Sequence, residues 1–143
     1  MKLYRVLALA LVLVMLGSAL IACEQEPEAP KKSITVAITI KDGPDKDAKI
    51  LGQEAEYTYT YKEGEEPTVT DILIDYCSYE ELELVFADEA QHTVNKIGST
   101  SAGAGTFWTF AINSQYLKNE SMYTYKVQPN DVIVVYLDSV SKD

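Results

Sequence analysis

The 143-residue sequence holds few side chains of the types that carry out chemistry. It has two cysteines, Cys23 and Cys77, and a single histidine, His92. A protein zinc site normally takes four Cys, His or carboxylate ligands, and a nucleophilic cysteine needs a histidine beside it, so this supply favours neither. Serine and aspartate are plentiful, but a hydrolase triad is defined by geometry rather than by supply. We therefore predict a protein that is not an enzyme and holds no metal.

The charge balance argues against one class of partner. Lys and Arg number 12 against 22 Asp and Glu, which gives a formal charge of -10. Nucleic-acid binding requires clustered cations to meet the phosphates, so no nucleic-acid partner is expected. The length suits one domain, and an apolar share of 47% is enough to build a core.

The first residues follow the three-part layout of a secretory signal peptide. Met1–Arg5 carries two cations, Val6–Leu16 is an uncharged apolar stretch, and small residues follow at positions 17–19. A membrane-spanning helix needs roughly 20 apolar residues, so this stretch is short for that role. The alternative interpretation is a retained membrane anchor, because residues 6–23 carry no charge.

The end of this stretch, Leu20-Ile21-Ala22-Cys23, resembles the lipobox of bacterial lipoproteins. The resemblance implies cleavage before Cys23 and a diacylglyceryl group on its sulfur. We expect residues 1–22 to be the signal peptide and residues 23–32 to be the lipidated cysteine and a charged, Pro-containing tether. The lipid would hold the protein on the extracytoplasmic face of the cell membrane. Cys77 would then have no disulfide partner, and we expect it to be a small buried apolar residue.

The elements behind the tether begin with two strands and a helix. Apolar residues alternate from Ile34 to Ile40, which predicts a strand with one buried face. A loop running to about Glu54 precedes a second strand, in which tyrosines alternate over 57–61, and the two strands are expected to pair as a hairpin. Thr68 and Asp71 form a capping-box pattern that predicts a helix from Thr68 to Cys77.

The remaining pattern predicts mostly strands. A continuous apolar run at 132–137 is typical of a strand buried on both faces at the centre of a sheet. Asn113-Ser114 is expected to be a tight turn, and 98–105 a flexible glycine-containing loop. Further strands are predicted at 82–86, 92–97, 107–112 and 123–127.

This order predicts an α+β domain over residues 33–138, followed by a tail at 139–143. One short helix would cover one face of a mixed sheet. The arrangement looks like a β-grasp (ubiquitin-like) fold, in which the last strand lies beside the first.

Three segments of the domain carry a resemblance to known proteins. Thr68–Leu73 reads T-V-T-D-I-L, the aromatic strand at 107–112 ends in Asn113-Ser114, and Pro129-Asn130-Asp131 leads into the last strand. These segments resemble the "T-V-x-D-x-L", "V-N-G" and "D-G-D-x-I" motifs of a β-grasp family of bacterial surface proteins, with the glycines replaced. That family is similar to the C-terminal domain of transcobalamin and intrinsic factor, and the resemblance covers roughly residues 33–137.

The resemblance implies a non-catalytic module that binds a small ligand, with cobalamin or another corrinoid as the candidate ligand. The small residues of the loop at 99–106 lie next to the aromatic strand, and together they are typical of a small-molecule pocket. An alternative for Trp108 and Phe110 is that both are simply core residues. The candidate ligand-binding residues are Ser101, Ala102, Gly103, Thr106, Phe107, Trp108, Tyr123 and Tyr125.

A second interpretation remains open, because the composition is acidic and rich in tyrosine. It is a cell-surface protein-interaction or adhesion module with the same fold and no corrinoid affinity. A pocket over Phe107, Trp108 and the loop at 99–106 would favour the small ligand. An exposed sheet edge there would favour a protein partner.

Overall fold

The computed structural model describes residues 28–117 and 119–140, so Cys23 and the predicted signal peptide lie outside the described residues. A five-stranded sheet has the strand order β2-β1-β8-β6-β7, and a smaller sheet has the order β3-β4-β5. The strand β1 pairs parallel with β8 and antiparallel with β2, and β6 pairs antiparallel with both β8 and β7. The elements are β1 (Lys31–Lys41), β2 (Ile50–Lys62), α2 (Val69–Tyr79), β3 (Leu84–Phe86), β4 (Val94–Ile97), β5 (Thr100–Ser101), β6 (Thr106–Ile112), β7 (Gln115–Tyr116) and β8 (Val132–Ser139).

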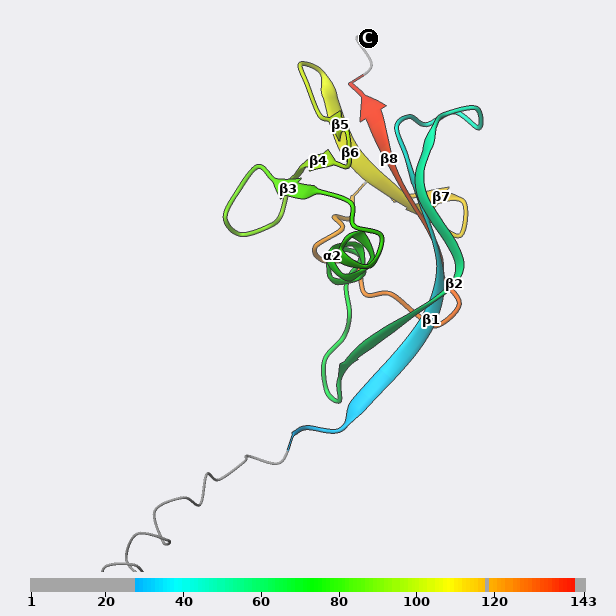
Figure 1. Ribbon diagram of the computed structural model, residues 1–143, viewed down its shortest axis with the longest axis vertical. Helices are drawn as coiled ribbons and strands as arrows, with labels where there is room; N and C mark the ends of the chain where they lie inside the picture. Colours follow the sequence, from blue (N-terminus) through cyan, green and yellow to red (C-terminus); the bar gives the residue numbers. More distant parts are fainter. Residues whose placement is uncertain (1–27, 118, 141–143) are drawn as a thin grey trace, which may run out of the picture.

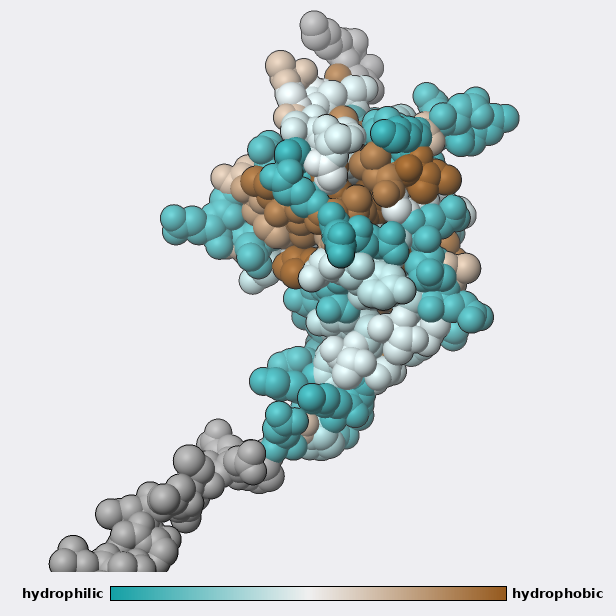
Figure 2. Space-filling model, viewed as in Figure 1, coloured by the Kyte–Doolittle hydropathy of each residue, from teal (hydrophilic) through white to brown (hydrophobic). Residues whose placement is uncertain are grey.

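The prediction of a mixed α+β architecture with one short helix is confirmed for the described residues. The helix α2 lies on one side of the curved sheet, with the small sheet beside it (Figure 1). Its buried residues include Ile72, Leu73 and Tyr76, and they pack with the alternating apolar residues of β1 in a single core. In Figure 2 apolar surface gathers in the upper half of the view, whereas the coloured surface below it is polar.

The β1–β2 hairpin forms as predicted, but its loop is shorter than expected. The register pairs Lys41 with Ile50 and Ile38 with Glu54, so the loop ends at Lys49 and not near Glu54. The reason lies in the turn. The Asp42 carboxylate accepts a hydrogen bond from Lys49 N at 2.8 Å, and Asp42 N donates to Lys49 O at 3.0 Å. These bonds close the loop, and pairing resumes directly after it.

The helix begins where the capping box predicts. Asp71 N donates to the Thr68 hydroxyl at 3.2 Å, and Thr68 N donates to the Asp71 carboxylate at 2.8 Å. The expected apolar face is buried from Val69 to Cys77, and the helix continues to Tyr79.

The last strand lies beside the first, as predicted, but only one of its faces is buried. Ile133 and Val135 are fully buried, whereas Val132 is 44% exposed. The prediction of burial on both faces is wrong because α2 packs on one face of the sheet, and Val132 points to the other. An apolar run alone does not separate these two cases.

Three other local predictions need correction. Residues 123–127 form no strand: they contribute one isolated bridge, between Lys126 and Thr68. The loop expected at 98–105 contains the short strand β5, whose Thr100 and Ser101 pair with Ile97 and Lys96 of β4. The strand expected over 82–86 is shorter and begins at Leu84.

Candidate binding site

The aromatic strand β6 has an open edge. One side of β6 pairs with β8 along its whole length, from Thr106 to Ile112. On the other side the two-residue strand β7 pairs only with Ala111 and Ile112. In the described part of the chain, the edge of β6 from Thr106 to Phe110 therefore has no strand hydrogen-bonded to it, although Trp108, Thr109 and Phe110 are buried.

The chain leaves this edge because it crosses to the start of α2. Met122 O accepts a hydrogen bond from Thr70 N at 3.0 Å, and Tyr125 O accepts one from Val69 N at 3.3 Å. These amides belong to the first turn of the helix, where no intrahelical acceptor exists. The crossing segment thus satisfies the helix N-terminus instead of extending the sheet.

A hollow of about 320 Å³ lies between the open edge and the crossing segment. Four consecutive residues of β6, from Phe107 to Phe110, line it. Successive side chains of a strand point to opposite faces, so a hollow that touches all four lies at the edge of the strand. The lining is completed by His92, Thr93, Val94, Tyr116, Glu120, Ser121 and Met122.

Trp108 combines burial with an unused hydrogen-bond donor. Its side chain is only 6% exposed, and among the described residues its indole Nε1 has no hydrogen-bond partner. Phe110 is 2% exposed, and its ring meets that of Tyr125 at a centroid distance of 5.9 Å. The alternative reading of Trp108 and Phe110 as core residues therefore agrees with their burial, although both also line the hollow. A buried donor without a partner costs about 1–3 kcal/mol, which is unusual in a native core.

The rim of the hollow is held in place by local contacts. The rings of His92 and Tyr123 lie 4.0 Å apart. The Asp88 carboxylate accepts hydrogen bonds from His92 N at 3.0 Å and from Thr93 N at 2.8 Å, which fixes the start of the lining segment. The His92 amide is the main reason that the pKa of Asp88 lies below its ordinary value. Phe107 and Tyr116 are 37% and 48% exposed and offer aromatic surface at the opening.

The structure brings only part of the sequence-predicted site together. Phe107 and Trp108 line the hollow, whereas Tyr123 does not and only packs its ring against that of His92, which does. Tyr125 packs on Phe110 from the crossing segment, and burial raises its pKa. The other four predicted residues, Ser101, Ala102, Gly103 and Thr106, do not line this hollow.

The turn at 103–106 instead satisfies its own polar groups. Gly103 N donates to the Thr106 hydroxyl at 2.7 Å, and Thr106 N donates to Gly103 O at 3.1 Å. These backbone donors are thus used within the turn and are not free for a ligand. The segments 92–94 and 120–122, which do line the hollow, carried no sequence signal that connects them with β6.

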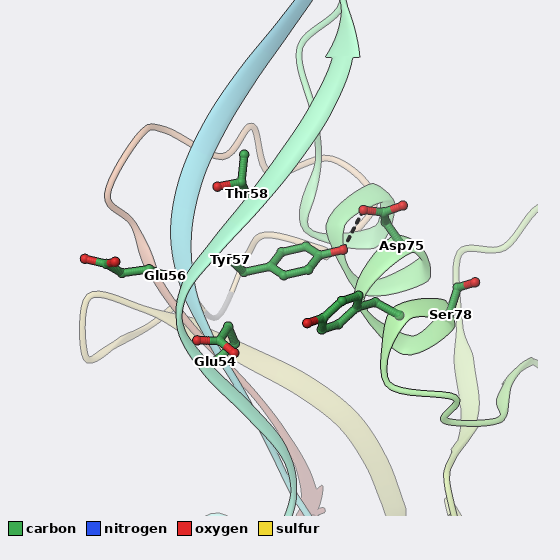
Figure 3. A pocket seen from close by; sticks show the side chains of 7 residues that line it. Glu54, Glu56, Tyr57, Thr58, Asp75 and Ser78 are labelled. Carbon is green, nitrogen blue, oxygen red and sulfur yellow. Dashed lines mark hydrogen bonds between the residues drawn. The ribbon is translucent and has the colours of Figure 1, made fainter.

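A larger hollow, of about 670 Å³, lies between β2 and α2 (Figure 3). Tyr57 extends from the strand toward the helix, and its hydroxyl donates to the Asp75 carboxylate at 2.6 Å. Glu54, Glu56 and Tyr79 also line it. Sequence reasoning missed this hollow, because nothing in the sequence connects Tyr57 with a carboxylate 18 positions later.

The groups in this region do not form a metal site. Among the described residues, no group of three or more His, Cys, Asp or Glu side chains could hold a metal ion. Burial, together with the hydrogen bond to Asp75, raises the pKa of Tyr57 well above its ordinary value. Tyr57 is thus a neutral donor at physiological pH. The hollow is an acidic groove that contains one satisfied tyrosine–carboxylate pair.

Cys77 is buried and free, as expected for a structural cysteine. Burial raises the pKa of its thiol to about 12, so the reactive thiolate is suppressed at neutral pH. No helix within residues 28–117 and 119–140 is long and apolar enough to cross a membrane.

Comparisons with known proteins show no family for this chain. No family model matches the sequence, and no curated protein matches it. A solved structure from Ruminococcus gnavus, described as a "putative metal binding protein", is similar in backbone. It aligns at 11% sequence identity with a TM-score of 0.45, over 76% of this chain and 99% of that one. This likeness is too low to carry an argument about function.

Proposed function

We propose that the protein is a lipid-anchored, non-catalytic binding module on the extracytoplasmic face of a cell membrane, and that it docks a protein partner at the open edge of β6. The observation that carries this proposal is the unpaired edge beside a hollow rich in aromatic side chains. Phe107 and Tyr116 are exposed at the opening of this hollow, and aromatic side chains dominate many contacts between proteins. The absence of a recognisable catalytic constellation in the sequence supports a binding role.

We also propose that the domain is a β-grasp. The support is the sheet order β2-β1-β8-β6-β7, in which an N-terminal hairpin, one helix and a central last strand follow each other in the order that such a fold requires. The parallel pairing of β1 with β8 agrees with it.

The anchor rests on the lipobox resemblance at Cys23. The test is expression of the full chain in a bacterium, with detergent-phase partitioning and the mass of the N-terminal peptide as readouts. The wild type should carry a diacylglyceryl mass on Cys23 and enter the detergent phase, because two acyl chains anchor a protein stably. Cys23→Ser should abolish both, while the matched change Cys77→Ser should alter neither. An unlipidated wild type would overturn the anchor.

The docking role is tested by photo-crosslinking on intact cells. A photoreactive phenylalanine analogue replaces Tyr116, which is exposed at the hollow beside β6, or Tyr79, which is exposed at the end of α2 and lines the other hollow. We expect a discrete crosslinked protein band from position 116 and none from position 79. The same bands from both positions, or none from 116, would contradict docking at β6.

A small ligand is the second candidate function, and the buried, unpartnered Trp108 Nε1 is the observation that favours it. The hollow is at the lower end of the roughly 300–1,000 Å³ range of small-molecule sites, so a corrinoid would fit only in part. The test is titration of Trp108 fluorescence with cobalamin and cobinamide, with free tryptophan as the control for light absorbed by the corrinoid. Saturable quenching beyond that control, lost in Phe107→Ala, would support corrinoid binding. Quenching equal to the control would exclude it.

A further inference from the structure

The two faces of the main sheet are covered unequally. Paired residues of neighbouring strands point to the same face of a sheet, and successive residues of one strand point to opposite faces. Two rows of paired residues face α2, and each of their members is at most 4% exposed (Figure 1). These rows are Ile38–Ile133–Ile112 and Ile40–Val135–Phe110. The residues between these rows point away from α2, the only helix of the described chain.

This outward side of the sheet is apolar where β1, β8 and β6 lie next to one another. Val132 is 44% exposed, Phe107 is 37% exposed and Tyr116 is 48% exposed. The pairing joins them into one surface, because Val134 lies opposite Ala111, which in turn lies opposite Tyr116. We define the outer apolar face as Phe107, Ala111, Tyr116, Val132, Val134 and Tyr136.

The same side of the sheet is polar farther down the β1–β2 hairpin. There the Ser33 and Thr60 hydroxyls lie 3.1 Å apart, and the Thr35 and Thr58 hydroxyls lie 3.4 Å apart. A solvated sheet face is normally polar in this way, whereas an apolar face is normally covered. The outer apolar face is therefore the part of this surface that a partner would cover.

The charges at the border of the outer apolar face are acidic. Asp138 pairs with Phe107 on the same side of the sheet, and Glu120 lines the adjoining hollow. Lys41 pairs with Tyr136, but its ammonium donates to Pro44 O at 3.4 Å and to Asp45 O at 3.0 Å, so it is held by the neighbouring loop. On a chain with a formal charge of -10, this border favours a partner that carries cations beside its apolar residues.

The size of the face distinguishes a helix from a second copy of this chain. The distance along β8 from Val132 to Asp138 is about 20 Å, and three strands are about 14 Å wide. An α-helix of about 13 residues is about 20 Å long and about 10–12 Å across, which matches this surface. Two copies joined by it would each cover about 300 Å², well below the roughly 800 Å² per partner of a stable interface. They would also bring together two molecules of formal charge -10.

From these observations we infer that the outer apolar face docks an amphipathic helix of the partner protein, with the apolar side of the helix on β1, β8 and β6 and its flanking Lys or Arg residues near Asp138 and Glu120. This inference rests on the proposed docking function and specifies its mode. Phe107 and Tyr116 belong both to the face and to the lining of the hollow, so the same helix covers the opening of the hollow. An apolar helix side laid on an apolar surface is a common form of protein recognition.

The test uses the full chain purified in detergent and a phage-displayed library of helical peptides of about 14 residues. Each peptide carries apolar residues at helical spacing, with random Lys, Glu or Gln beside them. Selected peptides are then measured against Val132→Glu and against the matched control Val85→Glu, which changes an exposed valine of the small sheet. We expect a loss of affinity of at least about tenfold with Val132→Glu and of less than about twofold with Val85→Glu, because only the first change buries a charge in the contact.

The selected peptides also report the chemistry and the conformation of the partner. Lys should outnumber Glu at the flanking positions, and Asp138→Asn should weaken binding by about two- to threefold, as expected for an exposed ion pair. Proline at a central position on the polar side of the peptide should weaken binding by about tenfold or more, whereas alanine there should not. The apolar residues are the same in both peptides, but proline breaks the helix.

Each contrary result overturns the inference in a distinct way. Peptides that depend on Tyr116 but not on Val132 would place the partner at the hollow alone, which refutes the helix on the face and leaves the docking function intact. Selected peptides that tolerate the central proline would refute the helix. Dimers of the full chain that Val132→Glu abolishes would make a second copy the occupant.

Crosslinking on intact cells separates a protein partner from a membrane. The photoreactive phenylalanine analogue at position 132 should give the same protein band as at position 116, and a lipid adduct in its place would make a membrane the occupant. Failure to select any Val132-dependent peptide would refute the inference, and the band from position 116 would then decide the docking function independently.

Discussion

Two tyrosines in contact offer a matched test of how polar groups contribute to this fold. Tyr57 and Tyr76 are 7% and 0% exposed, and their rings meet edge to face at a centroid distance of 5.1 Å. The Tyr57 hydroxyl donates to Asp75 at 2.6 Å, whereas the buried Tyr76 hydroxyl has no partner among the described residues. Replacing either by Phe removes one oxygen, so the two variants differ only in what that oxygen contacts.

The expected effects have opposite signs. Tyr57→Phe loses a hydrogen bond to a carboxylate, which is worth about 1.5 kcal/mol here because Asp75 is exposed. Tyr76→Phe removes a buried hydroxyl whose lack of a partner costs about 1–3 kcal/mol, so the variant should gain about 1 kcal/mol. The free energies of unfolding should therefore differ by about 2–3 kcal/mol, which corresponds to about 8 °C in Tm for a chain of this size.

Urea unfolding followed by the emission of Trp108, the one tryptophan of the chain, measures both variants. Adding Asp75→Asn to each variant completes the test, because it should cost little more once Tyr57 has lost its hydroxyl. Equal losses in Tyr57→Phe and Tyr76→Phe would refute the reasoning, since they would mean that the Tyr76 hydroxyl is hydrogen-bonded after all.

Three further predictions concern other parts of the fold. Ser114 has a φ of +67°, so Ser114→Gly should raise the free energy of unfolding by about 1 kcal/mol. The control Ser99→Gly lies at a residue without positive φ and should not raise it. Equal effects of the two changes would contradict the strain argument. The buried Asp131 carboxylate accepts hydrogen bonds from a main-chain N–H at 2.8 Å and from the Asn113 side chain at 2.9 Å. Asp131→Ala should cost about 2–3 kcal/mol in urea unfolding, and a loss below about 0.5 kcal/mol would argue against this network. Burial raises the pKa of Cys77 from 9.0 to about 12, so the folded protein keeps a proton that the unfolded chain releases. This contribution to the free energy of unfolding is complete below about pH 9 and declines above it by up to about 1.4 kcal/mol per pH unit. Cys77→Ala should flatten that decline between about pH 9 and 10. An unchanged slope would disprove the assignment to Cys77.

The parts of the fold that the sequence predicts are those in which one local pattern decides the structure. Alternation from Ile34 to Ile40 predicts a strand with one buried face, and that face forms part of the core. The Thr68–Asp71 capping box predicts the helix start, because both of its hydrogen bonds form within four residues. The Asn113-Ser114 turn joins β6 and β7 with positive φ at both residues, a geometry that Asn favours.

The errors occur where tertiary contacts override local pattern. Residues 123–127 alternate as a strand would, yet Tyr125 O accepts a hydrogen bond from Val69 N and Val127 N donates to Pro67 O. The apolar run at 132–137 predicts burial on both faces, but Val132 is exposed because nothing in the described chain covers that face. Neither result can be obtained from the spacing of residues along one segment.

The candidate site is predicted only in part for the same reason. The aromatic residues of β6 identified the correct strand, and Phe107 and Trp108 line the hollow. The other wall comes from positions 92–94 and 120–122, which the topology brings to the strand edge. The turn at 103–106 looked free because its glycines suggest flexibility, whereas the Thr106 hydroxyl satisfies it.

The chain that follows β7 could pair either with the edge of β6 or with the N-terminus of α2. Val69 and Thr70 are only 1% and 4% exposed, and their main-chain amides donate to Tyr125 O and Met122 O. If the chain after β7 continued beside β6, these two buried amides would lose their acceptors at about 1–3 kcal/mol each, so the gain from a longer β7 would be cancelled. The chain after β7 therefore supplies acceptors to the N-terminus of α2 and does not extend the sheet beside β6.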